Sequence, residues 1–258
     1  MYKRQSRIRL GSAAVLLPFR PPIEVAEDVA TIDILSNGRF DFGVARGGPF
    51  PEQNRHFGVL ADESRPRMLE ALQLVQRLLK EDCVSHEGRY FKADNIRLTP
   101  RPLQRPVPTW IASLSEDAIG DAAEHGFGVM AGLTSASDSI TQMLRIYLDR
   151  NSAADPQLVV SRFYCSATTH EVAIAEAIPF LRQFFERRRR LTFGSTAELP
   201  PLNLDGFIER SLIGSHDEVR AKLDALGELN MRSLLLVPAS EDARRRVALL
   251  EEFRANIR

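Results

Sequence analysis

An arginine followed by two glycines marks the segment of this chain whose residue types could bind an anion. Arg46, Gly47 and Gly48 come directly after residues 40–45, a short apolar run typical of a buried strand. A guanidinium group donates paired hydrogen bonds to phosphate oxygens, and glycines without a Cβ let the backbone turn and approach a ligand closely. The alternative is that Arg46 is a solvated surface charge, which a lone Arg-Gly-Gly does not exclude.

A second candidate for the same chemistry is the segment Ser113, Leu114 and Ser115. It lies at the end of an apolar run at residues 109–113 and directly before a predicted helix. The free N–H groups at the start of a helix attract anions. Ser115 is equally typical of an ordinary N-cap. If the two preceding runs are parallel strands, their carboxyl ends meet on one face of the sheet. We therefore predict that Arg46 and residues 113–115 share one phosphate.

The histidines and cysteines form no recognisable catalytic or metal-binding motif. The 5 histidines lie in predicted loops or near helix ends: His56, His86, His125, His170 and His216. No H-E-x-x-H sequence occurs, so we assign no catalytic residue and no metal ligand. The 2 cysteines, Cys83 and Cys165, are far apart and belong to no C-x-x-C pair. This favours structural thiols, with no disulfide and no zinc site, and a reducing cytoplasm as the location.

Apolar segments that alternate with helical patterns must position these residues. The predicted strands are 8–17, 40–45, 109–113, 127–131, 158–166 and 233–238. The predicted helices are 24–35, 63–80, 116–125, 137–150, 171–190, 216–229 and 241–257. Such alternation indicates an α/β fold with a parallel sheet. Residues 194–205, rich in Pro and Gly, are expected to form a flexible excursion before the last strand.

Bulk composition limits the classes of partner. With 258 residues, 44% of them hydrophobic, the chain is long enough for one α/β barrel domain. Its formal net charge of zero argues against nucleic acid or a membrane surface as a partner, and the basic run 187–190 is typical of a solvated helix end. No apolar run approaches the roughly eighteen residues of a membrane span, and no signal peptide is recognisable.

Several short motifs follow one another along nearly the whole chain. They lie at residues 10–18, 27–30, 35–47, 56–59, 63–65, 87–91, 100–104, 108–112, 122–130, 214–219 and 234–238. In this order they resemble the bacterial luciferase-like family of flavin-dependent monooxygenases. The motifs together are specific for that family, and none is specific for a substrate.

The resemblance implies a TIM (β/α)8-type barrel in which residues 8–17 match the third strand. The first two βα units of the family then have no counterpart. We accordingly expect residues 1–258 to form a single luciferase-like barrel domain, incomplete at its amino terminus because of a truncated reading frame, with residues 1–5 extraneous. The alternative is an internal start that produces a genuine short form.

The resemblance also implies which residues contact the cofactor. Ala13 and Ala14 match a bulge in the third strand that touches the flavin and contains a cis peptide bond not involving proline. The expected cofactor-binding residues are Ala13, Ala14, Arg46, Gly47, Gly48, Ser113, Leu114 and Ser115. The family's catalytic histidine lies in the unmatched amino-terminal part. A reactive cysteine found in some members corresponds to Ala45, so thiol chemistry is not expected.

The activity that the resemblance implies is oxidation of a small organic substrate, such as an aldehyde or a sulfonate, by reduced FMN and molecular oxygen. It also implies a homodimer when full length and a separate flavin reductase as a candidate partner. Three alternatives stay open at this point: a deazaflavin-dependent oxidoreductase that transfers hydride, a flavin-binding protein without turnover, and an inactive fragment.

Overall fold

The structure is a computed structural model that describes residues 7–48, 50–113, 115–152, 157–193, 202–228 and 233–256. Strands and helices alternate along it, as predicted. The chain divides into two compact units, Met1–Ser113 and Leu114–Arg258, and each is described by itself below. The expectation of one domain over residues 1–258 stays a prediction.

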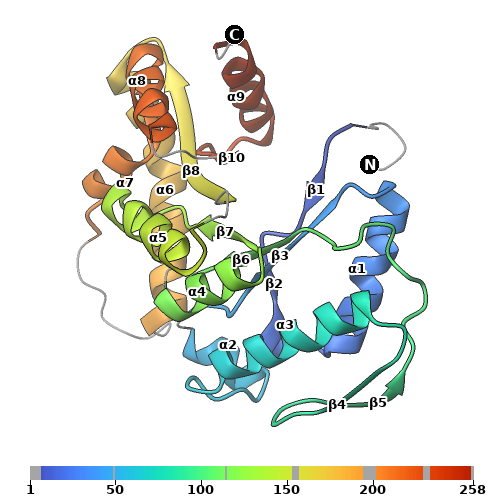
Figure 1. Cartoon of the computed structure of the whole chain (residues 1–258). Helices are drawn as coiled ribbons and strands as arrows, with labels where there is room; N and C mark the ends of the chain where they lie inside the picture. The colour runs from blue at the N-terminus through green and yellow to red at the C-terminus, as the bar shows by residue number, and fades with distance from the viewer. Residues whose placement is uncertain are drawn as a thin grey trace. The chain divides into compact units, whose positions relative to one another are not determined.

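Parallel strands form the sheet of the first unit (Figure 1). β1 (Leu10–Gly11) and β2 (Val15–Leu16) pair with successive parts of β3 (Phe40–Ala45), which in turn pairs with β6 (Thr109–Ala112). All of these pairings are parallel. Ala45, the last residue of β3, is in register with Ala112, the last residue of β6. The residues that follow these two strands therefore emerge at the same edge of the sheet.

The expected single strand at residues 8–17 is wrong, because the structure has two short strands there, β1 and β2, with a break between them. Between β1 and β2, the Ser12 hydroxyl donates to the Gly43 carbonyl and accepts from the Gly43 N–H, each at 2.9 Å. The side chain thus takes over hydrogen bonds that a regular ladder would make through the backbone. The peptide bond between Ala13 and Ala14 is cis. This confirms the geometry predicted for the pair.

Two long helices cover the first unit. α1 (Pro22–Ser36) buries Val25 and Val29, and α3 (Ser64–Lys80) buries Leu72, Val75 and Leu79, at the spacing of one helix face. The two helices pack against each other (Figure 1). Shorter elements complete the unit: the 3-10 helix η1 (Leu17–Phe19), α2 (Pro51–His56) and a hairpin of β4 (Val84–Glu87) and β5 (Lys92–Ile96).

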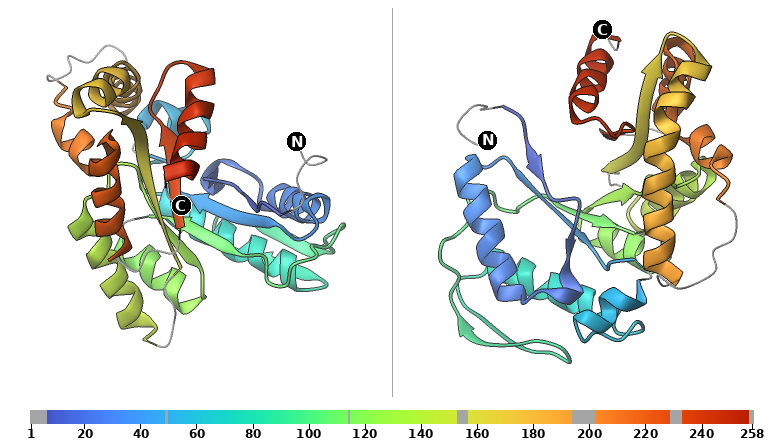
Figure 2. Two further views of the ribbon diagram at one scale, coloured as in Figure 1. Left: turned by 90° about the horizontal axis from the view of Figure 1, so that it is seen from above. Right: turned by 180° about the vertical axis from the view of Figure 1, so that it is seen from behind.

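The second unit is built around one long strand, β8 (Leu158–Ala167). It pairs in parallel with β7 (Gly128–Ala131), β9 (Leu212–Ser215) and β10 (Ser233–Pro238). Its helices are α4 (Glu116–Glu124), α5 (Ser137–Arg150), α6 (His170–Phe193), α7 (Asp205–Arg210), α8 (His216–Gly227) and α9 (Ala243–Asn256). The long helix α6 runs beside β8 (Figure 2).

Aromatic rings make the contact between β8 and α6. Phe163 meets Phe180, Phe184 and Phe185 edge to face, with ring centroids 6.1, 5.1 and 5.9 Å away. Phe185 also stacks on Phe207 of α7 at 4.1 Å. Edge-to-face rings add stabilisation beyond the area that they bury. These contacts fix α6 and α7 on the second unit.

The bounds of several elements agree with the sequence prediction, whereas some short elements were missed. β3, α5 and β10 have the predicted bounds. The prediction did not include α2, α7 or β9, because a helix of six residues and a strand of four residues are too short to show a clear period. In the predicted excursion 194–205, residues 194–201 lie outside the described residues and α7 begins at Asp205.

Candidate functional site

Arg46 and Ser113 follow the carboxyl ends of two adjacent parallel strands. The register of β3 and β6 places Ala45 opposite Ala112, so the residue after each strand lies at the same edge. Arg46 is exposed and makes no hydrogen bond or ion pair with any residue that the structure describes. This guanidinium group is therefore available to an anion at the sheet edge where parallel α/β proteins bind ligands.

Gly47 and Gly48 occupy positions where a larger residue does not fit the backbone and its surroundings. Gly47 has a φ of +94°, and a Cβ on it would lie 3.1 Å from Cε2 of Phe19. A Cβ on Gly48 would lie 2.4 Å from Cε2 of Phe50. The two glycines therefore let the rings of Phe19 and Phe50 pack closely against the backbone of this loop.

Gln53 of α2 lies beside this loop, although no pattern in the sequence indicates it. Its Oε1 is buried without a hydrogen-bond partner in the described part of the chain, and it lies 3.6 Å from the position of a Cβ on Gly47. A buried polar atom without a partner is costly. Its oxygen can accept a hydrogen bond from a hydroxyl group of a ligand at the loop.

Ala13 and Ala14 lie in the same unit, in the break between β1 and β2. Ala13 is exposed and Ala14 is half-buried. The break is tied to β3 through Ser12, and Leu16 of β2 is in register with Ala45. The cis peptide and the Arg46 loop are thus carried by neighbouring strands of one sheet.

Of the other predicted contacts, Leu114 lies outside the described residues and Ser115 belongs to the second unit. Ser115 occupies the N-cap position of α4 with extended backbone (φ −85°, ψ 139°), and its side chain makes no capping hydrogen bond. Glu116 and Asp117, in the first turn of α4, are both exposed. The predicted sharing of one phosphate between Arg46 and residues 113–115 stays a prediction.

The histidines of the second unit are held by polar partners. His125 Nδ1 lies 2.8 Å from the Asp121 carbonyl oxygen, and His216 Nδ1 lies 2.6 Å from Ser166 Oγ. Ser166 is 1% exposed, which closes it to a substrate. Because Ser166 and His216 are 50 residues apart, no local motif could have predicted the pair. The geometry does not assign either residue to catalysis.

Buried groups on β8 are structural. Burial, reinforced by the nearby Glu176, raises the pKa of the Cys165 thiol to about 12, so this thiol is unreactive. Arg162 is 2% exposed and donates to the carbonyl oxygens of Ser161 and Ser135 at 2.9 and 3.0 Å. Burial, together with the charge of Arg210, lowers the pKa of Arg162. In the sequence, only the position of Arg162 inside an apolar strand indicates that this arginine is buried.

Within the described ranges, no group of three or more His, Cys, Asp or Glu side chains is arranged to hold a metal ion. In the same ranges, no helix combines the length and the apolar character that a membrane span needs.

A model of the luciferase-like monooxygenase family matches residues 1–233 of this chain. The match covers most of the sequence, and the chain therefore belongs to this family. The resemblance inferred from the short motifs is confirmed.

Two relatives match over much of their length. An uncharacterized protein of Sinorhizobium fredii is 30% identical over 251 residues, which cover 93% of this chain and 73% of that protein. The oxygenase component of a flavin-dependent trigonelline monooxygenase of Acinetobacter baylyi is 28% identical over 245 residues, which cover 86% of this chain and 67% of that protein.

Among solved structures, monooxygenase RslO1 of Streptomyces bottropensis is similar over 97% of this chain and 78% of its own, with a TM-score of 0.84 and 27% identity. The predicted fold class, an α/β barrel of the luciferase-like type, is confirmed.

Proposed function

We propose that this chain is the oxygenase of a two-component, flavin-dependent monooxygenase that oxidises a small organic substrate with reduced FMN and molecular oxygen. The observation that carries the proposal is the exposed Arg46 with Gly47 and Gly48, at the carboxyl end of β3 and beside the end of β6. Reduced FMN supplies the electrons that activate oxygen. Aldehydes and sulfonates are the substrate classes that we propose.

The residues at this edge fit the phosphate of FMN. Arg46 offers a permanent cation with paired donors and is not engaged by the described residues. The left-handed backbone of Gly47 lets the loop approach an anion without a side chain in the way. Ser113, at the end of the neighbouring strand, adds a hydroxyl to the same edge. Leu114 and Ser115 remain in the proposal as the second half of the phosphate site.

The ring system and sugar chain of the flavin have candidate contacts in the same unit. Ala13 and Ala14 carry side chains small enough for a flat ring to approach their backbone, and we assign them that contact. The buried Oε1 of Gln53 is an acceptor for a flavin hydroxyl. No base is assigned, so the role of these residues is to bind and orient the cofactor.

The partners follow from the relative in Acinetobacter baylyi, whose name describes the oxygenase component of its enzyme. A separate reductase that delivers reduced FMN is therefore part of the proposal, as is a homodimer of the full-length protein. A cytoplasmic location is proposed from the two free cysteines, Cys83 and Cys165.

The proposal is tested with the Arg46→Ala variant. Flavin fluorescence titration should show that it binds FMN less tightly than the unmodified chain by about 1.5–3 kcal/mol, the range for hydrogen bonds to a charged group. Arg55→Ala, on the exposed surface of α2, is the matched control and should bind as the unmodified chain does. An unchanged dissociation constant in Arg46→Ala would make Arg46 a surface charge only.

Two further measurements separate the alternatives. Tighter binding of a deazaflavin than of FMN would favour the deazaflavin-dependent oxidoreductase that transfers hydride over the FMN-dependent monooxygenase. FMN binding without any oxygen consumption, in the presence of a flavin reductase and aldehyde or sulfonate substrates, would identify a flavin-binding protein without turnover.

A further inference from the structure

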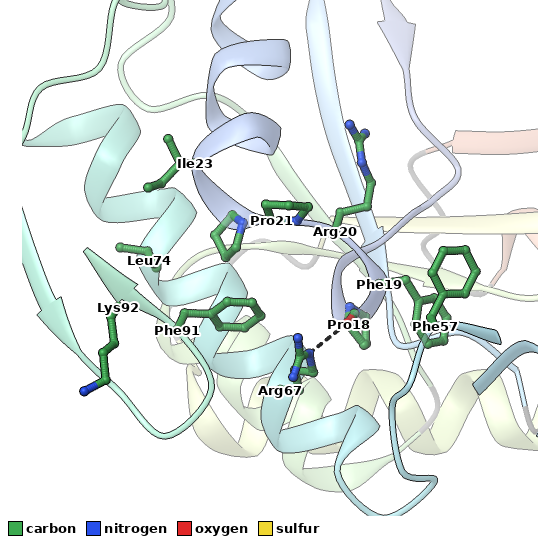
Figure 3. Close-up of a pocket in the computed structure, with 11 residues that line it drawn as sticks. Pro18, Phe19, Arg20, Pro21, Ile23, Phe57, Arg67, Leu74, Phe91 and Lys92 are labelled. Atoms are coloured by element: carbon green, nitrogen blue, oxygen red, sulfur yellow. Dashed lines mark hydrogen bonds between the residues drawn. The ribbon is translucent and has the colours of Figure 1, made fainter. Parts of the chain in front are cut away.

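The first unit contains a groove of about 390 Å³, and its lining includes none of the residues proposed to bind the cofactor. It lies between η1 and the start of α1 on one side and α3 with the β5 end of the hairpin on the other (Figure 3). The lining residues are Pro18, Phe19, Arg20, Pro21, Pro22, Ile23, Phe57, Arg67, Leu74, Phe91 and Lys92. Its volume falls within the range of roughly 300–1,000 Å³ that is usual for small-molecule sites.

The walls of the groove are apolar and aromatic. Phe19 and Phe57 stack with ring centroids 4.9 Å apart, and Phe91 approaches from the hairpin. Ile23 adds partly exposed aliphatic surface. A ligand body that fills this groove must therefore be apolar and is best flat, so that it can lie against the aromatic rings.

The charged groups in the lining are all positive: Arg20, Arg67 and Lys92. Two of them are compensated by acidic partners outside the lining, since Arg20 pairs with Asp28 at 2.7 Å and Lys92 pairs with Glu87. Arg67 pairs with no carboxylate in the described part of the chain. The groove therefore has one uncompensated cation and favours an anionic head group.

Arg67 is held in place before any ligand arrives. Its Nε donates to the Pro18 carbonyl oxygen at 2.9 Å, the contact drawn in Figure 3. Its guanidinium carbon lies 4.8 Å from the centre of the Phe91 ring. The two terminal nitrogens make no hydrogen bond to described residues, so they can donate to a planar anion. The amino-terminal end of the 15-residue helix α1, at Pro22 and Ile23, adds a favourable dipole.

We propose that this groove is a second ligand site, for a small amphipathic anion with a flat apolar body and one carboxylate or sulfonate head. The body lies among Phe19, Phe57 and Phe91, and the head binds the terminal nitrogens of Arg67. The site is distinct from the Arg46 loop, although Phe19 touches both: it lines the groove and lies next to Gly47.

The test compares the binding of two fluorescent probes that are similar in size and differ in charge. Anilinonaphthalene sulfonate carries the anionic head, and the neutral phenylnaphthylamine does not. The full chain should bind the sulfonate probe more tightly than the neutral one. Arg67→Met should weaken binding of the sulfonate by about tenfold or more, Arg67→Lys should restore part of it, and Arg145→Met, on the exposed face of α5, should leave it unchanged.

A second variant keeps the test decisive if loss of the Arg67 contact to Pro18 disturbs the fold. Ile23→Glu puts a negative charge into the groove, and an acidic residue is favourable in the first turn of α1. It should bind the sulfonate probe more weakly with unchanged circular dichroism. Equal binding of both probes, or sulfonate binding that neither Arg67→Met nor Ile23→Glu weakens, would overturn the proposal.

Discussion

Gly47 is the residue at which the proposed cofactor loop should be least tolerant of change. Its φ of +94° is strained for any residue with a Cβ, and that Cβ would press on Phe19 at 3.1 Å. We expect Gly47→Ala to lower the free energy of unfolding by about 1–2 kcal/mol, from the cost of a left-handed backbone alone. Urea denaturation followed by circular dichroism measures this loss.

The matched control is Gly227→Ala. Gly227 ends helix α8, its φ is not positive, and a Cβ there meets nothing within 4 Å. Alanine should be neutral or stabilising at such a position, because it loses less conformational freedom than glycine in a helix. If Gly47→Ala were as stable as Gly227→Ala, the loop would have to relax without strain, contrary to the close contact with Phe19.

Residue types and spacing were sufficient to predict Arg46, Gly47 and Gly48 as a loop at a strand end, because glycine and a strand-terminal arginine are visible in the sequence. They could not predict Gln53 or the closeness of Phe19. Those contacts depend on how α2 and η1 fold back onto the loop, and no local pattern records that.

At the scale of elements, the carboxylate of Glu70 joins helix α3 to the tip of the β4–β5 hairpin. It accepts hydrogen bonds from the backbone N–H groups of Arg89, Tyr90 and Phe91 at 3.1, 3.0 and 2.8 Å. A Cβ on Gly88 would lie 2.0 Å from Glu70 Oε1, so glycine is required for this approach. The Glu70 carboxylate thus binds the hairpin tip to α3 through three backbone N–H groups.

This arrangement predicts a pH-dependent stability. Burial alone would raise the pKa of Glu70, but the N–H groups of Phe91 and Tyr90, aided by His86, lower it below its ordinary value of 4.5. A carboxyl with a lowered pKa in the folded state stabilises the protein above the unfolded pKa, and the contribution is lost as the pH falls through the folded pKa. Glu70→Gln should therefore cost about 1.5–3 kcal/mol at neutral pH, and the difference should shrink as the solution is acidified.

Urea denaturation at a series of pH values measures that difference. Glu87→Gln is the control on the same hairpin, since the Glu87 side chain is 79% exposed and its pair with Lys92 should contribute little. A constant difference between Glu70→Gln and the unmodified chain at every pH would show that the charge of Glu70 is irrelevant to its role.

The long elements were predictable because a dozen or more residues show a clear period, as in α3 and α5. The start of α8 at His216 is also explained locally, since Ser215 and Glu218 form a capping box. The break between β1 and β2 has no recognisable pattern in the local sequence. It depends on hydrogen bonds between the Ser12 hydroxyl and Gly43 of another strand. Only the resemblance to known relatives indicated a bulge there.

For the whole molecule, alternation of strands and helices predicted an α/β fold, and the family resemblance specified the barrel type. Both are confirmed by the similarity to RslO1 over 97% of the chain. The number of cooperative units could not be predicted in the same way. Cooperativity depends on packing between segments far apart in the sequence, and Met1–Ser113 and Leu114–Arg258 each have a core of their own.

Each unit carries its own probe for testing the predicted single domain. The only tryptophan of the sequence, Trp110, lies in β6 of the first unit. Cys165 lies fully buried in β8 of the second unit, and burial raises its pKa to about 12. This thiol therefore reacts with a thiol reagent only after unfolding.

The measurement uses the Cys83→Ser variant, which removes the other thiol and keeps a donor for Asn95. A single cooperative domain predicts that tryptophan fluorescence and Cys165 labelling change at the same urea concentration, because loss of one shared core affects both residues together. Circular dichroism of Cys83→Ser, compared with the unmodified chain, checks that the substitution leaves the fold intact. Two separate midpoints would show that the two compact units unfold independently and that the prediction of one domain is wrong.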